Sequence, residues 1–376
     1  MKDSAKTTPG TGKGRLLSLD ALRGFDMLWI IGGSGVISTL AENSDAGWLD
    51  ALAVQMTHVT WNGFHFYDLI FPLFMFISGI AIPYSVKSAL AKNPSKTKLL
   101  LKVFKRMVIL VILGILYNGV FKDGFENARY ASVLGQIGVA YFFASVIYIY
   151  SKSVKAVLFW LAGILIGVSV LQLFVPVPGA GAGVFTPEGV MNGYIDRLYL
   201  PGRLAYFNGI FDALGILSVV SAIGITVMGI AGGKILQNTS FSEYRKTGML
   251  AGIGLISILL ALALSPVYPI IKVCWTTTYN LLAGGISFLL IALFYLIIDV
   301  WGYQKWSFFF RIIGMNSVFI YLFGRIVPVA MITGFFIGWI IKPLGGSGEV
   351  IGAIAVIAAE WLLLWFMYKK NVFVKV

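Results

Sequence analysis

The sequence predicts an all-α, polytopic helical membrane protein, and two observations lead to this prediction. Of the 376 residues, 58% are hydrophobic and only 12% are charged, whereas a soluble domain carries about twice that share of charge. Apolar runs of roughly 20 residues, the length of a membrane-spanning helix, recur along the whole chain. Because these runs are continuous rather than alternating, they exclude a β-barrel.

We expect about ten transmembrane helices and one extra re-entrant or interfacial segment. The extra segment is 326–345, which is apolar but interrupted by Pro328, Pro343 and several glycines. The first span follows a polar, basic stretch and is too long for the core of a signal peptide, so we expect it to stay as an anchor. The predicted spans are 17–40, 66–86, 100–121, 131–150, 156–175, 211–236, 247–265, 278–299, 308–325 and 349–368.

The positions of the basic residues predict the orientation of these spans. With ten spans and both termini in the cytoplasm, 21 of the 29 Lys and Arg residues lie on the cytoplasmic side, as the positive-inside rule requires. The net charge of +13 is therefore explained by topology, and we expect no nucleic-acid partner. The predicted organisation is a cytoplasmic basic tail, 1–15, and a single transmembrane domain, 16–376, with a long extracytoplasmic loop at 176–210. Loops of that length are often functional.

The chain has only two histidines, and both lie just before the second span. His58 and His65 stand in the polar stretch that leads to Asp68 and the apolar run after it. Imidazole is the default proton carrier near neutral pH, and His58, in the loop, is the better candidate for a base. Asp68 either caps the following helix or orients a histidine by accepting its ring N–H.

Acidic residues inside predicted spans need an explanation, because charge in hydrocarbon is costly. Asp20 and Arg23 are three residues apart on one helical face. They form an interfacial salt bridge, or Arg23 receives a phosphate that enters from the cytoplasm. Asp26 is harder to explain as a surface residue. A secondary transporter that uses Asp20, Asp26 and Asp68 for ion coupling is one hypothesis for the whole set.

Further candidates lie near the predicted outer interface. Asp196 and Arg197 predict a local ion pair or loop anchor, with sugar binding as the alternative. Trp61 and Trp275 are either interfacial belt residues or platforms for a sugar ring. A single cysteine, Cys274, excludes an intrachain disulfide and a thiolate metal cage, and we expect no metal. As a lone cysteine it is more typical of a small packing residue than of an acyl carrier.

Several motifs follow one another in a fixed order over nearly all of residues 15–376. They are Ser18-Leu-Asp20-Ala-Leu-Arg23-Gly24, His58-Val-Thr-Trp61-Asn62-Gly63, Asp68-Leu-Ile-Phe71-Pro72, Gly193-Tyr194-Ile-Asp196-Arg197, Asp212-Ala-Leu-Gly-Ile-Leu, Lys272-Val-Cys-Trp275 and Gly314-Met315-Asn316-Ser317. Together they resemble the heparan-α-glucosaminide N-acetyltransferase family and its bacterial members.

The resemblance implies a transmembrane acetyltransferase. Such an enzyme takes acetyl-CoA from the cytoplasm and delivers the acetyl group to a glucosamine-type amine on the opposite side of the lipid bilayer. The resemblance also implies that His58 is the catalytic histidine, that the protein forms a homodimer, and that a bacterial member lies in the inner, cytoplasmic membrane. The main rivals are O-acetylation of a cell-envelope glycan and the secondary transporter described above.

Within this hypothesis each polar candidate has an expected role. A neutral His58 accepts the proton of the attacking amine, or it first carries the acetyl group itself; we favour direct transfer. Amide donors at Asn62 and Asn316 are expected to stabilise the charge that develops on the thioester oxygen. The phosphorylated end of CoA is expected to meet basic groups and their neighbours on the cytoplasmic side, at Arg23, Asp20, Lys105 and Arg106.

Overall fold

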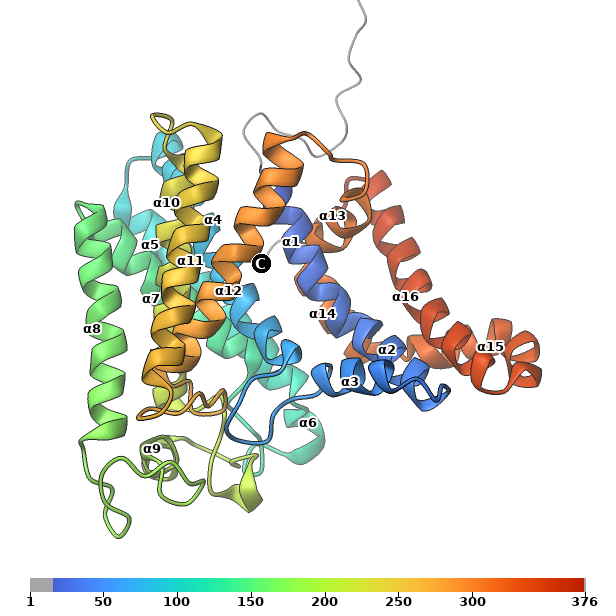
Figure 1. Ribbon diagram of the computed structural model, residues 1–376, viewed down its shortest axis with the longest axis horizontal. Coiled ribbons are helices and arrows are strands. Elements are labelled where there is room, and N and C mark those ends of the chain that lie inside the picture. The colour runs from blue at the N-terminus through green and yellow to red at the C-terminus, as the bar shows by residue number, and fades with distance from the viewer. Residues whose placement is uncertain (1–15, 375–376) are drawn as a thin grey trace, which may run out of the picture. The chain divides into compact units, whose positions relative to one another are not determined.

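The computed structural model describes residues 16–374, so the predicted basic tail, 1–15, lies outside the described residues. Between 16 and 374 the chain is helical, with isolated backbone bridges but no β-strand (Figure 1). The predicted all-α fold class is confirmed. The helices form two compact units, one of residues 58–292 and the other of 16–57 together with 293–374. The prediction of a single domain stays a prediction.

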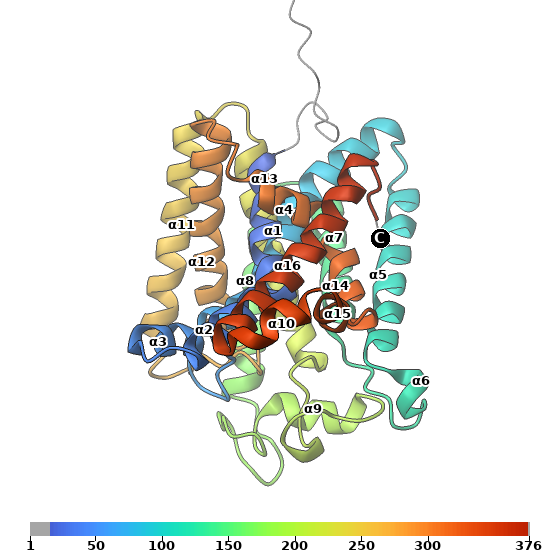
Figure 2. The ribbon, with the colours of Figure 1, turned by 90° about the vertical axis from the view of Figure 1, so that its right-hand side faces the viewer.

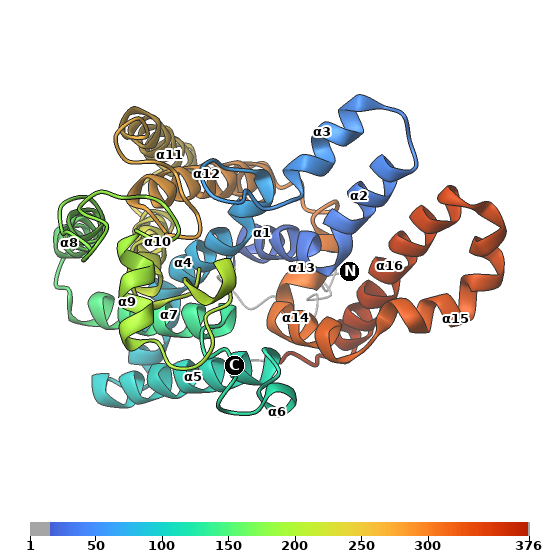
Figure 3. The ribbon, with the colours of Figure 1, turned by 90° about the horizontal axis from the view of Figure 1, so that it is seen from below.

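The first of these, here called the central-chain unit, is residues 58–292. Its helices are η2 (Phe66–Leu69), α4 (Ile70–Lys92), α5 (Lys96–Tyr117), α6 (Val120–Asp123), α7 (Val133–Tyr150), α8 (Val154–Leu173), α9 (Met191–Tyr199), η3 (Phe207–Gly209), α10 (Ile216–Gln237), α11 (Glu243–Leu264) and most of α12 (Thr277–Tyr295). The largely buried α10 contacts α4, α7, α8, α9 and α11. Figures 1 and 2 show the long helices of this unit running alongside one another, and Figure 3 shows α9 across one end of them.

Glycines allow α4 and α10 to pack with their backbones close together. A Cβ atom at Gly79 would lie 2.0 Å from the carbonyl oxygen of Thr226, and one at Gly229 would lie 2.1 Å from that of Phe76. Small residues permit this close approach where membrane helices cannot rely on the hydrophobic effect to associate. The contact holds α4 in place, and α4 carries Asp68 just before one end and Lys87 near the other.

Serine side chains define where four helices begin. Each accepts a hydrogen bond from a backbone N–H in the first turn, a group that otherwise has no partner within the helix. The capping residues are Ser95 for α5, Ser132 for α7, Ser153 for α8 and Ser242 for α11.

The terminal-chain unit contains both ends of the described chain. Its helices are α1 (Leu17–Leu28), η1 (Trp29–Gly33), α2 (Ser34–Glu42), α3 (Gly47–Gln55), the end of α12, η4 (Leu296–Val300), α13 (Phe308–Met315), α14 (Ser317–Ile326), α15 (Val329–Ile341), η5 (Lys342–Leu344) and α16 (Gly346–Lys369). α1 packs on α13 through Gly24 and Gly314, where a Cβ atom would clash with backbone. α15 and α16 run side by side (Figure 3).

The helices correspond closely to the predicted spans. Within the described residues, eight helical segments are long and apolar enough to cross a membrane, and the pair α13 and α14, bent by 73°, would make nine. α5 covers the remaining predicted span but has five basic residues in its first half. The 13-residue α15 is about 20 Å long, short of the roughly 30 Å of hydrocarbon, which fits a re-entrant or interfacial segment. The number ten stays a prediction.

Candidate active site

The loop that carries His58 is paired with the segment that precedes α12. Asn62 forms an antiparallel bridge with Ile271, and the N–H of Gly63 donates to the carbonyl of Ile270 at 2.9 Å. Gly63 has φ of 126°, a conformation that favours glycine. The pairing brings His58 next to Lys272, a residue 214 positions away in the sequence.

Three ionisable side chains meet at this pairing: His58, Asp68 and Lys272. Nδ1 of His58 lies 2.8 Å from Oδ1 of Asp68. Nζ of Lys272 donates to the same oxygen at 3.0 Å and lies 2.7 Å from the His58 Nδ1. The Asp68 side chain is fully buried, whereas 53% of the His58 side chain is exposed. The half-exposed imidazole of His58 is therefore in contact with the buried carboxylate of Asp68.

Backbone groups fix the Asp68 carboxylate from its other side. Oδ2 of Asp68 accepts from the N–H of His65 at 3.0 Å and from that of Val59 at 3.3 Å. The hydroxyl of Tyr279, on α12, donates to the Asp68 backbone carbonyl at 2.9 Å. Asp68 thus contacts both the start of η2 and the His58 ring, and its role in orienting that ring stays a prediction.

The Asp68 contact favours one tautomer of His58. An ionised Asp68 only accepts hydrogen bonds, which suits a hydrogen on His58 Nδ1 and a lone pair on Nε2; Nζ of Lys272 lies 2.7 Å from Nδ1 and 3.3 Å from Nε2. A lone pair at an exposed ring is what a general base needs. Burial lowers the pKa of the Lys272 ammonium, and the Asp68 carboxylate acts in the opposite direction. Tyr67 covers one side of the imidazole, with ring centroids 4.8 Å apart.

Sequence reasoning missed Lys272 as a site residue and counted it only for topology. The sequence held one indication that Lys272 could be a site residue, which was its predicted location. It is one of the few basic residues predicted on the outer side, and it opens the Lys272-Val-Cys-Trp275 motif. Nothing local in the sequence indicates its pairing with Asp68.

Trp61 joins the His58 loop to the long loop of 176–210. Its indole N–H donates to the carbonyl of Phe185 at 2.7 Å, and its ring packs edge-on against Phe207 and Phe211. The long loop therefore lies beside the His58 loop. Asn62 is exposed in the same stretch.

Trp275 and Cys274 lie in the interior of the central-chain unit. Trp275 is 1% exposed and lies edge-on between the rings of Phe71 and Tyr279. We therefore leave Trp275 out of the proposed sugar site, because no face of its ring is open. Cys274 is buried, and burial raises the pKa of its thiol. This environment fits a packing residue.

Asp196 and Arg197 have different partners. The buried Asp196 accepts the N–H of Ile216 at 2.9 Å, at the start of α10, and burial raises the pKa of its carboxyl to about 7. The Arg197 guanidinium donates to the carbonyl of Ile210 at 2.9 Å. Both contacts hold the long loop against the helices, and a role in sugar binding stays a prediction.

A second ion pair anchors the same end of the unit. The Arg129 guanidinium donates to both oxygens of the buried Asp212, at 2.8 and 2.7 Å. Asp212 also accepts the N–H groups of Ala205 and Leu214. The Asp212 motif therefore positions the segment before α10.

The remaining predicted residues lie elsewhere, and their roles stay predictions. In the central-chain unit Lys105 is exposed on α5, and the guanidinium of Arg106 lies 4.3 Å from the centroid of the Tyr141 ring.

The other predicted residues belong to the terminal-chain unit. Asp20 pairs with Arg23 at 3.4 Å. The fully buried Asp26 has no hydrogen-bond partner among the described residues. The Asn316 side-chain amide forms hydrogen bonds with the backbone of Val372 and Val374.

Comparison with known proteins supports the resemblance in the motifs. A family model described as a domain of unknown function, DUF5009, matches residues 15–198. The chain is 29% identical over 373 residues to the heparan-alpha-glucosaminide N-acetyltransferase of Mus musculus. It is 27% identical over 379 residues to that of Homo sapiens. Each alignment covers 85% of this chain but 56% and 55% of the relatives, so the chain spans about half the length of the curated relatives it matches. The predicted similarity to the heparan-α-glucosaminide N-acetyltransferases is confirmed.

Proposed function

We propose that this protein is a transmembrane acyltransferase that moves an acetyl group from acetyl-CoA to the amine of an amino sugar, with His58 as the general base. The observation that carries the proposal is the half-exposed His58, whose Nδ1 lies 2.8 Å from the buried Asp68 carboxylate. The names of the similar proteins, both N-acetyltransferases, support the acetyl group and the amine acceptor.

In the proposed reaction the sugar amine attacks the thioester carbonyl, a C–N bond forms, and the C–S bond breaks. His58 Nε2 accepts the proton that the amine loses and returns it to the sulfur of CoA. The Asp68 carboxylate holds the ring by accepting the Nδ1 hydrogen and stabilises the imidazolium that forms, as in other His–Asp pairs. The exposed Asn62 amide donates to the oxygen of the tetrahedral intermediate.

The position of the site supports transfer across the membrane. Asp68 and Lys87 are 19 positions apart, most of them in α4, which is about 29 Å of helix and close to the thickness of the hydrocarbon core. The His58 loop and the lysine-rich end of α4 therefore belong to opposite membrane faces. By the positive-inside rule the lysine-rich face is cytoplasmic, which leaves His58 and the acceptor on the other side.

The test uses the purified full chain with acetyl-CoA and glucosamine, and measures both released CoA thiol and N-acetylated sugar. We expect His58→Ala to lower turnover by about 10²- to 10⁴-fold. His65→Ala is the matched control. It removes the other histidine side chain but keeps the His65 backbone N–H that bonds to Asp68, so we expect it to retain most activity. Equal turnover of His58→Ala and wild type would refute the proposal.

Two further measurements define the chemistry. Replacing glucosamine by N-acetylglucosamine leaves only hydroxyl acceptors, so continued CoA release would indicate O-acetylation. Incubation with radiolabelled acetyl-CoA alone separates direct transfer from an acetyl-histidine intermediate. We expect no stable label on the protein; label on wild type that is lost in His58→Ala would show that His58 carries the acetyl group.

A further inference from the structure

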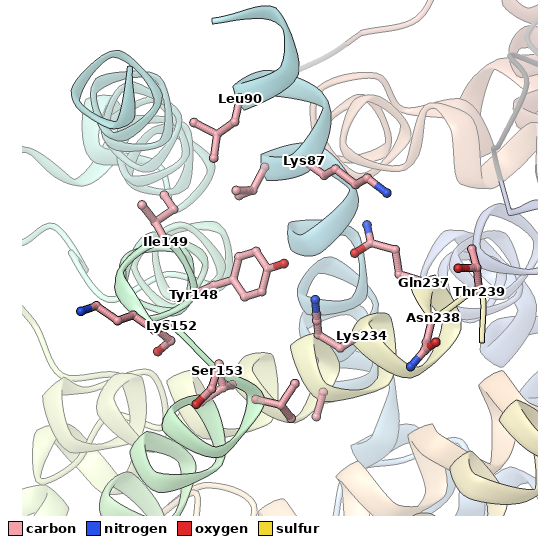
Figure 4. Close-up of a pocket in the computed structure, with 15 residues that line it drawn as sticks. Lys87, Leu90, Tyr148, Ile149, Lys152, Ser153, Lys234, Gln237, Asn238 and Thr239 are labelled. Atoms are coloured by element: carbon pink, nitrogen blue, oxygen red, sulfur yellow. The ribbon is translucent and has the colours of Figure 1, made fainter. Parts of the chain in front are cut away.

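A second polar site lies in the central-chain unit, at the end of α4 opposite the His58 loop. It is a cavity of about 670 Å³ between the ends of α4, α7 and α10 and the beginning of α8. Figure 4 shows its lining. This volume lies within the range of roughly 300–1,000 Å³ that is usual for small-ligand sites. The proposed acetyl transfer does not use this cavity.

Four polar side chains from three helices direct their ends toward the same space in Figure 4. They are Lys87 of α4, Tyr148 of α7, and Lys234 and Gln237 of α10. Nζ of Lys234 lies 6.0 Å from the centroid of the Tyr148 ring. All four can donate hydrogen bonds, and two of them carry a positive charge. The lining residues have no carboxylate among them.

Two further features of the cavity favour an anionic ligand. The Oγ of Ser151, which also lines the cavity, is buried and has no hydrogen-bond partner among the described residues. The cavity also includes Ser153 and Val154, where the 20-residue α8 begins. A helix N-terminus presents backbone N–H groups and partial positive charge, which favour phosphate. Lys87 is exposed, but Lys234 is partly buried, and a partly buried lysine without an acid beside it is costly unless something neutralises it.

We propose that this cavity binds the phosphate group of an anionic ligand, held by Lys87, Lys234, Tyr148 and Gln237. An anionic phospholipid headgroup and a soluble phosphate share this chemistry. The predicted cytoplasmic position of this end favours the lipid, because anionic lipids are abundant in that leaflet and attract lysines near the surface.

The experiment is native mass spectrometry of the full chain released from phosphatidylcholine micelles with and without phosphatidylglycerol. We expect wild type to retain phosphatidylglycerol in preference to phosphatidylcholine. The double variant Lys87→Gln with Lys234→Gln should lower the retained fraction about 25-fold, because each of the two lysines near an anionic lipid contributes about a factor of five. The control, Lys92→Gln with Lys155→Gln, removes the same charge from exposed positions outside the cavity and should change retention less than about twofold.

A second arm separates the two sources of phosphate. Inorganic phosphate and CoA are each added, and the melting temperature of the protein is measured. If the ligand is soluble, one of them raises the melting temperature of wild type but not that of the double variant, and phosphatidylglycerol is not retained.

Tyr148→Phe removes one hydroxyl and should reduce ligand binding about threefold. If the double variant does not fold, this single variant provides the test of the proposal. No preference for phosphatidylglycerol together with no response to phosphate or CoA, or equal binding by the double variant and its control, would overturn the proposal.

Discussion

The two ends of the central-chain unit differ in what lies beside their charged side chains. At the His58 end, two buried carboxylates are paired with basic side chains of the chain: Asp68 with Lys272 and His58, and Asp212 with Arg129. At the other end, Lys87 and Lys234 line a cavity that has no carboxylate among its lining residues. The ion pairs at the His58 end are therefore internal to the chain, whereas the two lysines of the cavity have no carboxylate beside them in its lining.

This difference indicates whether the geometry of each end is fixed before a ligand binds. A buried ion pair contributes little net stability but holds its groups in a fixed geometry. At the His58 end that geometry sets the orientation of an imidazole. At the other end, the two lysines line a cavity that has no carboxylate among its described lining residues, which favours a neutralising group from outside the chain. We infer that the first end is organised before substrate binds, whereas the second is completed by its ligand.

The largest expected effect comes from changing the carboxylate at the centre of the paired end. In Asp68→Asn an amide can donate to His58 Nδ1, which places the lone pair on the wrong nitrogen. We expect acetyl transfer to fall on the order of 10³-fold, measured as CoA release with glucosamine. Asp50→Asn, an exposed site on α3, is the matched control. Activity of Asp68→Asn within about threefold of that control would show that the orientation of His58 is unimportant.

A smaller effect is expected from Lys272→Gln, which removes one partner of Asp68 but leaves three donors. We expect kcat to fall about ten- to a hundredfold while KM for acetyl-CoA changes little, because Lys272 acts through Asp68 and His58 rather than on the donor. Lys272→Arg keeps the charge and should recover part of kcat. The exposed Lys122, changed to Gln, is the control. A rise in KM with unchanged kcat would instead place Lys272 in substrate binding.

The smallest effect is a pH dependence of stability that comes from Asp196. Burial raises the pKa of its carboxyl from 3.8 to about 7, so between these values the folded chain holds a proton that the unfolded chain releases. Stability from this group is therefore greatest at low pH and falls by up to about 1.4 kcal/mol per pH unit across that window. Thermal unfolding at pH 5 and pH 8 should show a smaller difference in Asp196→Asn than in wild type.

Glu188→Gln is the control for this prediction, because it removes an exposed carboxylate from the same loop. If Asp196→Asn and Glu188→Gln keep the same pH dependence as wild type, the proton is not held at Asp196.

Local sequence was enough to predict the fold class, the positions of the long helices and the short segment after α14. Hydrophobic runs and their interruptions are local properties, and a membrane requires every such run to be helical. The same local logic selected His58 and Asp68, since both lie within one short polar stretch before α4. The i,i+3 spacing of Asp20 and Arg23 likewise predicted the pairing that they form.

Tertiary structure decided the rest. Lys272 reaches Asp68 across 204 residues only because two loops pair, and no spacing in the sequence encodes that pairing. Trp275 looks like an interfacial aromatic residue in the sequence but is enclosed by Phe71 and Tyr279, because the direction of a side chain depends on packing. The cavity of Lys87 and Lys234 joins helices that are far apart in the chain. Hydropathy is set residue by residue, whereas the partner of a charge is set by which helices meet.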